Sequence, residues 1–141
     1  MINKKSDITA QYYCIGKIRA KQQDKKARAL MAKQQALATR LQKDGFTIQF
    51  GYLLKSDNHY HEKGVDVQLA VNIVKDAHEN RYNIAYLISS DSDLTPAIIE
   101  AQRIGKTICY VGFKHKISYA LLKICRKSHL LTRDDLLPFI K

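Results

Sequence analysis

The first third of the chain predicts a strand, a long helix and a second strand. β-branched and aromatic residues dominate Ile8–Ile18, as is typical of a strand. Apolar residues then recur at helical spacing between Gln22 and Asp44. The stripe that they form consists of Ala27, Leu30, Met31, Leu37, Ala38 and Leu41. Gly45 follows where a helix would end. Phe46–Leu54 predicts the second strand, and the polar segment Lys55–Lys63 predicts a loop.

Strands and helices continue to alternate in the rest of the chain. The pattern predicts helices at Val65–Glu79, Asp93–Ile104 and Ile117–Cys125, strands at Ile84–Ile88, Thr107–Val111 and Ser128–Thr132, and a helical turn around Asp134–Ile140. Such alternation is typical of an α/β fold with a mainly parallel sheet and helices on both of its faces. We therefore expect a three-layer α/β/α arrangement, formed as a single domain over residues 1–141.

Two carboxylates follow the apolar run Ile84–Ile88, which predicts a buried strand. Asp91 lies where ligands bind in open α/β sheets, beyond the carboxyl end of a strand. Ser92 is a natural N-cap for the next helix, and Asp93 lies in the first turn of that helix. A structural role explains Asp93, since an acidic residue there complements the helix dipole. It explains Asp91 less well, because a like charge two residues away costs free energy unless a cation compensates it.

A third carboxylate, Asp66, occupies the first turn of the helix predicted at Val65–Glu79. On a helical wheel it falls on the same side as Ala70, Ile73 and Ala77, which is the apolar side. An inward carboxylate needs a hydrogen bond, a counter-charge or a metal ion. Capping of the helix is one explanation, and convergence with Asp91 and Asp93 on one cation is the other.

The three carboxylates Asp66, Asp91 and Asp93 suit Mg²⁺ or Mn²⁺, hard cations that take oxygen ligands and retain water. Such an ion would activate a water molecule and neutralise charge on a phosphodiester. The candidate substrate contacts are Lys63, Ser89, Ser92 and Lys114. The segment Asp91–Thr95 also matches the D-x-D-x-T loop of haloacid dehalogenase-like phosphatases, which leaves a small phosphoester open as a substrate.

The charge of the chain favours a polyanionic partner. Lysine and arginine number 24 and aspartate and glutamate 13, so the net charge is 24 − 13 = +11. Residues 1–44 carry eleven basic side chains against three acidic ones, and residues 101–133 carry eight basic and no acidic ones. Basic segments on either side of an acidic centre suit a nucleic acid, whose phosphates must approach a metal ion.

Cysteine usage and hydropathy indicate the compartment. Cys14, Cys109 and Cys125 are an odd and scattered set in apolar contexts, which predicts reduced core cysteines instead of disulfides or a zinc site. No apolar run approaches the ~20 residues of a membrane span. The first ten residues lack the apolar segment of a secretory signal. We therefore expect a cytoplasmic protein without a membrane partner.

Two motifs resemble the NYN domain family, in its LabA-like branch of the PIN-like nuclease superfamily. They are "KGVDVQLAVNIV", which contains Lys63, Gly64 and Asp66, and "YLISSDSDLTPAIIEAQRIGKTI", which contains the S-x-D-S-D pattern Ser89–Asp93 and then Pro96, Gly105 and Lys106. With the upstream "YYCIGKIRA", the resemblance covers nearly the whole chain. It implies a metal-dependent ribonuclease with Asp66, Asp91 and Asp93 in the acidic site. We expect its partner to be RNA, and single-stranded RNA in preference to double-stranded RNA.

The chain departs from this family pattern at its start. NYN domains usually open with a strand that ends in an Asp, and no such strand precedes Tyr12, because Asp7 lies before its strand and does not end it. We therefore expect an N-terminally truncated NYN domain that is weakly active or inactive alone, or that is completed by another chain or a homo-oligomer. A non-catalytic module that binds RNA or protein is the alternative function.

Overall fold

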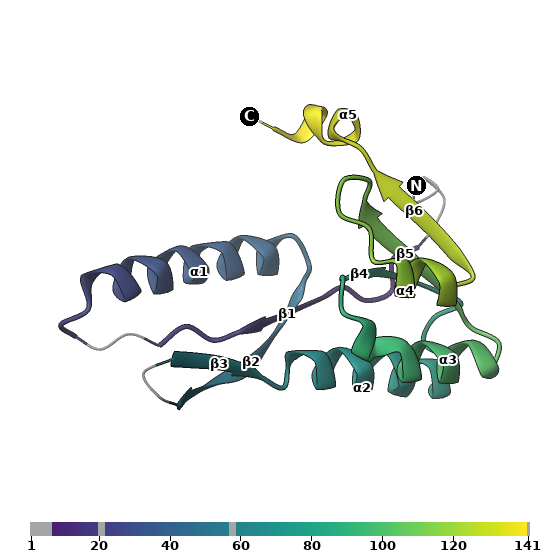
Figure 1. The fold of residues 1–141 in the computed structure, drawn as a ribbon, viewed down its shortest axis with the longest axis horizontal. Coiled ribbons are helices and arrows are strands. Elements are labelled where there is room, and N and C mark those ends of the chain that lie inside the picture. Colours follow the sequence, from purple (N-terminus) through teal and green to yellow (C-terminus); the bar gives the residue numbers. More distant parts are fainter. Residues whose placement is uncertain (1–6, 20–21, 57–58, 141) are drawn as a thin grey trace. The chain divides into compact units, whose positions relative to one another are not determined.

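The computed structural model describes residues 7–19, 22–56 and 59–140. Figure 1 shows strands and helices alternating along these segments. The elements are, in order, β1 (Tyr12–Gly16), α1 (Lys25–Lys43), β2 (Thr47–Ser56), β3 (His59–Lys63), α2 (Val65–His78), β4 (Ile84–Ile88), the 3₁₀ turn η1 (Ser92–Leu94), α3 (Thr95–Arg103), β5 (Thr107–Phe113), α4 (Tyr119–Ile124), β6 (Lys127–Leu131), α5 (Arg133–Leu136) and η2 (Leu137–Phe139). The chain has an α/β fold, as predicted.

Contacts divide the chain into two compact units. The N-terminal unit contains β1, α1, β2 and β3, and the C-terminal unit contains residues 70–141. Helix α2 begins at the end of the first unit and continues without a break into the second.

The N-terminal unit holds a three-stranded sheet in the order β1-β2-β3. β1 runs parallel to β2, with Tyr12 opposite Thr47, and β3 runs antiparallel to β2, with Tyr52 opposite Lys63. The loop predicted at Lys55–Lys63 is therefore wrong, because most of this segment forms the end of β2 and all of β3. Backbone hydrogen bonds hold an edge strand whatever its side chains are, so a polar sequence can still form one.

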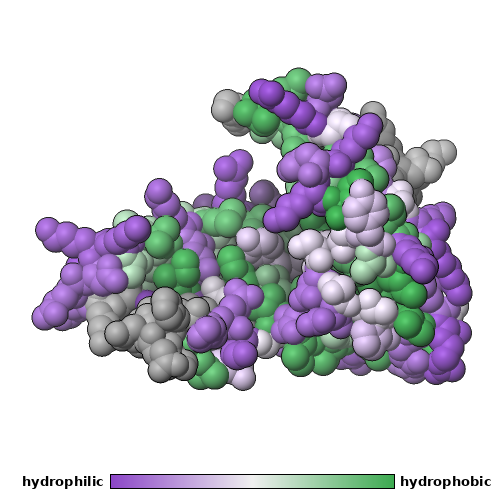
Figure 2. Space-filling model, in the orientation of Figure 1, coloured by the Kyte–Doolittle hydropathy of each residue, from purple (hydrophilic) through white to green (hydrophobic). Residues whose placement is uncertain are grey.

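Helix α1 begins three residues later than predicted, because the side chain of Asp24 caps it and accepts a hydrogen bond from the Ala27 amide at 2.9 Å. Gly45 follows its end with φ of 90°, as expected. Of the predicted apolar stripe only Ala38 is buried, whereas Leu30, Met31 and Leu37 are exposed. Hydrophilic side chains project along this helix in Figure 2.

The C-terminal unit is built on a wholly parallel sheet in the order β4-β5-β6. β5 lies in the centre, and Ile108, Cys109, Tyr110 and Val111 are buried along it. Each large apolar side chain buried in this way stabilises the fold by roughly 1.5–3 kcal/mol. β4 was expected to be a buried strand, but only its Leu87 is buried, because β4 is an edge strand in this sheet.

The turn after β5 is fixed by a tyrosine and a glycine. The Tyr110 hydroxyl is buried in the unit and accepts a hydrogen bond from the Ser118 amide at 3.0 Å. A Cβ atom at Gly112 would overlap the hydroxyl and ring of Tyr110, so only glycine fits there. The Lys116 amide also donates to the Phe113 carbonyl at 2.9 Å. The segment from Phe113 to Ser118 is thus held at both of its ends.

The connection from α2 to β4 is secured by polar contacts. The Tyr82 hydroxyl donates to the Ile73 carbonyl at 2.8 Å, and burial together with the nearby Asp76 carboxylate raises the pKa of Tyr82 to about 12. The buried Lys106 donates to the side chain of Asn80, a residue with φ of 54°. These contacts hold the C-terminal half of α2 in the unit.

The cysteines are thiols, as their spacing in the sequence predicts. Cys14, Cys109 and Cys125 form no disulfide bond; Cys109 and Cys125 are buried, and the half-buried Cys14 donates its thiol to the Gln49 side chain at 3.3 Å. Burial is the main reason why the pKa of the Cys125 thiol rises to about 11. Within the described segments, no helix has the length and apolar character needed to cross a bilayer.

The pairing of α2 with α3 predicts how stability depends on pH. Arg103 donates two hydrogen bonds of 2.8 Å to Glu100, which also contacts His78 at 3.0 Å. These partners, Arg103 first, lower the pKa of Glu100 from 4.5 to about 2. Because the pKa in the folded state is the lower one, the Glu100 carboxylate stabilises the fold fully above about pH 4.5 and loses this effect as the pH falls towards 2.

We therefore expect the free energies of unfolding of wild type and Glu100→Gln to differ above pH 4.5 and to converge near pH 2. Urea titrations at several pH values measure this difference. Arg103→Gln, which removes the partner, should show the same convergence. A difference that stays constant down to pH 2 would contradict the assignment.

Candidate metal centre

The loop after β4 is organised by its own side chains. The Ser89 hydroxyl accepts a hydrogen bond from the Asp91 amide at 3.1 Å, and Oδ1 of Asp91 accepts one from the Asp93 amide at 2.9 Å. The residue that caps the 3₁₀ turn η1 is thus Asp91, and the prediction of Ser92 as the cap is wrong. The reason is that the chain first forms a 3₁₀ turn over Ser92–Leu94, so the α-helix begins only at Thr95.

The third carboxylate comes from the first turn of α2. Asp66 is half-buried, two residues after Gly64, whose φ of 85° suits glycine. Ile73 and Ala77 on the same side of the helix are buried, as the helical wheel predicts.

Asp66, Asp91 and Asp93 each offer one carboxylate oxygen within 4.8 Å of the other two. Oxygen ligands of an octahedral Mg²⁺ lie ~2.9 Å apart when adjacent and ~4.2 Å apart when opposite, so the three oxygens would have to move closer together to bind one ion. Asp91 and Asp93 are exposed, and Oδ1 of Asp91 is already bonded to the Asp93 amide. The donors are all carboxylates, the chemistry that suits Mg²⁺ and Mn²⁺.

The four candidate substrate contacts lie in different elements. Ser89 is in the loop itself, and Ser92 is the first residue of η1. Lys114 is exposed directly after β5, and its amide donates to the Leu131 carbonyl at 2.9 Å. Because β4 and β5 are parallel neighbours, Lys114 and Asp91 follow their strands at the same edge of the sheet. Lys63 is exposed at the end of β3, three residues before Asp66.

Two features of the described residues were not predicted. The first is Asp76, a second inward carboxylate of α2, and its position three residues after Ile73 on the apolar side was the available signal.

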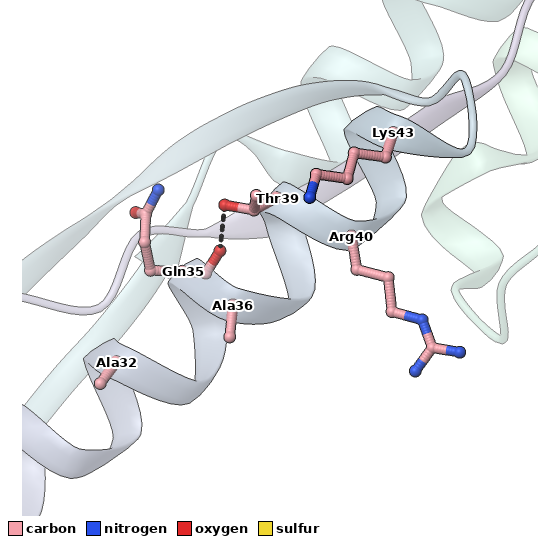
Figure 3. Close-up of a pocket in the computed structure, with 6 residues that line it drawn as sticks. All are labelled: Ala32, Gln35, Ala36, Thr39, Arg40 and Lys43. Atoms are coloured by element: carbon pink, nitrogen blue, oxygen red, sulfur yellow. Dashed lines mark hydrogen bonds between the residues drawn. The ribbon is translucent and has the colours of Figure 1, made fainter.

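The second is a shallow depression along α1, lined by Ala32, Gln35, Ala36, Thr39, Arg40 and Lys43 (Figure 3). Its one internal hydrogen bond, from the Thr39 hydroxyl to the Gln35 carbonyl at 2.9 Å, belongs to the helix, and no predicted site residue lines it.

Comparison with known proteins identifies the family. The NYN domain model matches residues 1–132. The chain belongs to the NYN domain family. The crystal structure of a protein of unknown function from Vibrio parahaemolyticus resembles it with a TM-score of 0.63 and 19% identity, over 89% of this chain and 69% of that one, which supports the fold. No curated protein matches the chain.

Membership of the NYN family gives the acidic cluster a chemical context. NYN domains fall among the PIN-like nucleases, which typically use divalent metals, and a cluster of three carboxylates is compatible with that chemistry.

Asp91 has two roles that substitution can separate. Asn in its place keeps an oxygen for the Asp93 amide but loses the charge, so Asp91→Asn should keep its stability while its affinity for Mn²⁺ falls ~10–100-fold. Asp91→Ala should lose both the metal and about 1 kcal/mol of stability from the cap. Calorimetric titration with Mn²⁺ and thermal unfolding measure the two effects. Equal Mn²⁺ binding by wild type and Asp91→Asn would rule out Asp91 as a ligand.

Proposed function

We propose that this NYN domain hydrolyses RNA phosphodiester bonds with a divalent metal ion held by Asp66, Asp91 and Asp93. The observation that carries the proposal is the approach of these three carboxylate oxygens to within 4.8 Å of one another, in a chain of this family. A bound Mg²⁺ or Mn²⁺ would lower the pKa of a water molecule and neutralise charge on the phosphate.

The remaining steps belong to the residues of the chain. Asp66 is the least exposed of the three carboxylates, and it is held by the helix that carries it, so it would fix the position of the ion. Asp91 and Asp93 are exposed and open to substrate. The hydroxyls of Ser89 and Ser92 would donate to phosphate oxygens, and Lys63 and Lys114 would pair with the flanking phosphates.

The basic side chains around the sheet edge favour a nucleic acid over a small phosphoester. Lys114, His115 and Lys116 are all exposed on the constrained turn after β5, and Arg133 is exposed shortly after β6. The ends of β4, β5 and β6 share one edge because the three strands are parallel. Basic side chains at the sheet edge that also carries Asp91 and Asp93 suit a chain of phosphates. We propose that the substrate is single-stranded RNA and that the protein acts in the cytoplasm.

A module that binds RNA without cleaving it is the second candidate function. The observation that favours it is the cap that Asp91 provides to η1, because this hydrogen bond gives the residue a structural reason to be present.

The decisive experiment is cleavage of a labelled single-stranded RNA with Mg²⁺, with Mn²⁺ and with EDTA. We expect metal-dependent cleavage that falls at least ~100-fold in Asp66→Asn and Asp91→Asn, because each removes a ligand. Asp134→Asn, an exposed acid of α5, is the matched control and should cleave like wild type. Cleavage that persists in Asp91→Asn would place the activity elsewhere, and turnover of p-nitrophenyl phosphate alone would favour the small phosphoesterase.

Binding can be tested separately from cleavage, in EDTA. If Lys114 pairs with a phosphate, Lys114→Gln should weaken binding and reduce the slope of log affinity against log salt by about 0.7. Lys75→Gln, which changes an exposed lysine of α2 outside both basic segments, should leave the slope unchanged. Equal slopes for wild type and Lys114→Gln would exclude this contact, and wild-type binding without cleavage would favour the non-catalytic module.

A further inference from the structure

The turn after β5 places aromatic rings among cations. The segment from Phe113 to Tyr119, which we term the aromatic turn, has the sequence FKHKISY, with three aromatic rings, two lysines and no acidic residue. The side chains that carry the rings and the lysine charges are all exposed. Rings interleaved with cations are typical of surfaces that bind single-stranded nucleic acid, because rings stack on bases and cations pair with phosphates. In Figure 1 the aromatic turn joins the end of β5 to α4.

The aromatic turn is ordered by its own hydrogen bonds. The Lys116 amide donates to the Phe113 carbonyl at 2.9 Å, and the same two residues form an antiparallel bridge. Lys114 and His115 therefore lie at the tip. The hydroxyl of Tyr110 holds the other end of the turn, where α4 begins. A surface that is ordered in this way loses less conformational entropy when a ligand binds.

The three rings lie outside the core of the C-terminal unit. Phe113 directly follows the buried residues 108–112 of β5, yet it is 37% exposed. Its ring contacts that of His115, with the centroids 5.8 Å apart and the planes inclined at 38°. Tyr119, the first residue of α4, is 73% exposed. One exposed aromatic side chain is ordinary, but three on one ordered turn that also carries two lysines indicate a binding surface.

We propose that Tyr119 and the ring pair of Phe113 and His115 stack on unpaired bases of single-stranded RNA, while the two lysines of the turn pair with its phosphates. This inference rests on RNA as the proposed substrate and adds contacts to the bases. The aromatic turn follows β5 at the sheet edge where the acidic loop follows β4. An RNA strand held here would therefore lie along the edge that carries the candidate metal centre.

Stacking predicts which polymers the surface accepts. In a duplex each base is stacked between its neighbours and its face is hidden, whereas a single strand offers its bases to aromatic side chains. Every base has such a face, so we expect single strands of different sequence to bind. An acidic peptide would pair with the lysines but would leave the rings unused.

The first test is the binding of labelled oligouridine to the full chain in EDTA, where metal-dependent cleavage does not occur. Tyr119→Ala and His115→Ala should each weaken binding at least ~5-fold, because each removes a stacking ring. Tyr119→Phe, which keeps the ring, should bind like wild type. Tyr86→Ala is the matched control, since Tyr86 is an exposed tyrosine in the middle of β4, and it should also bind like wild type.

The outcomes separate this inference from the proposed function. Equal affinity of wild type and Tyr119→Ala would overturn the stacking of Tyr119 and leave RNA as the substrate. Equal affinity of wild type and His115→Ala would do the same for the ring pair. A wild-type chain that binds no RNA would overturn both proposals.

The second test separates stacking from folding. An abasic oligonucleotide of the same length keeps the phosphates and lacks the bases, so wild type and Tyr119→Ala should bind it equally. Lys114→Gln should weaken binding to both polymers, because it acts on the phosphates. If Tyr119→Ala weakens binding to the abasic polymer as much as binding to oligouridine, its effect is structural and the stacking proposal is wrong.

Discussion

The C-terminal unit depends on the burial of β5 between two parallel neighbours. β5 supplies the central core residues Ile108, Tyr110 and Val111, and the register of both flanking strands is set against it. Parallel pairing brings the ends of all three strands to one edge, so the acidic loop after β4 and the basic turn after β5 become neighbours. The chemistry at this edge thus follows from the direction in which the strands pair.

Local sequence predicted the elements whose side chains decide their own structure. The helix around Asp66, its inward face at Ile73 and Ala77, and the apolar run of β5 were all evident from periodicity. Asp66 and Asp91 could be suggested as a pair because the rule for strand ends is geometric. Contacts between residues far apart in the local pattern, such as that between Tyr82 and the Ile73 carbonyl, could not be predicted from the sequence.

The wrong predictions share a cause, which is that backbone geometry outweighed side-chain preference. The segment before Lys63 reads as a polar loop, yet it pairs with β2 through main-chain hydrogen bonds. Ser92 is a good capping residue, but a 3₁₀ turn moves the cap to Asp91. The run Ile84–Ile88 is apolar enough for a central strand, and the sequence alone could not show that β4 is the first strand in the order β4-β5-β6 of the described residues.

The contact between Tyr110 and Gly112 limits how this sequence can diverge. The tyrosine hydroxyl fills the space that a side chain at position 112 would need, and it also holds the Ser118 amide. A larger residue at 112 is compatible only with a smaller one at 110, and that change removes the acceptor for Ser118. Substitutions at positions 110, 112 and 118 should therefore be coupled, because a single substitution at one of them leaves a poorly packed core. Among relatives, residues 110 and 112 should change together, so the pair of residues found in a given chain should be inherited as a pair from its ancestor.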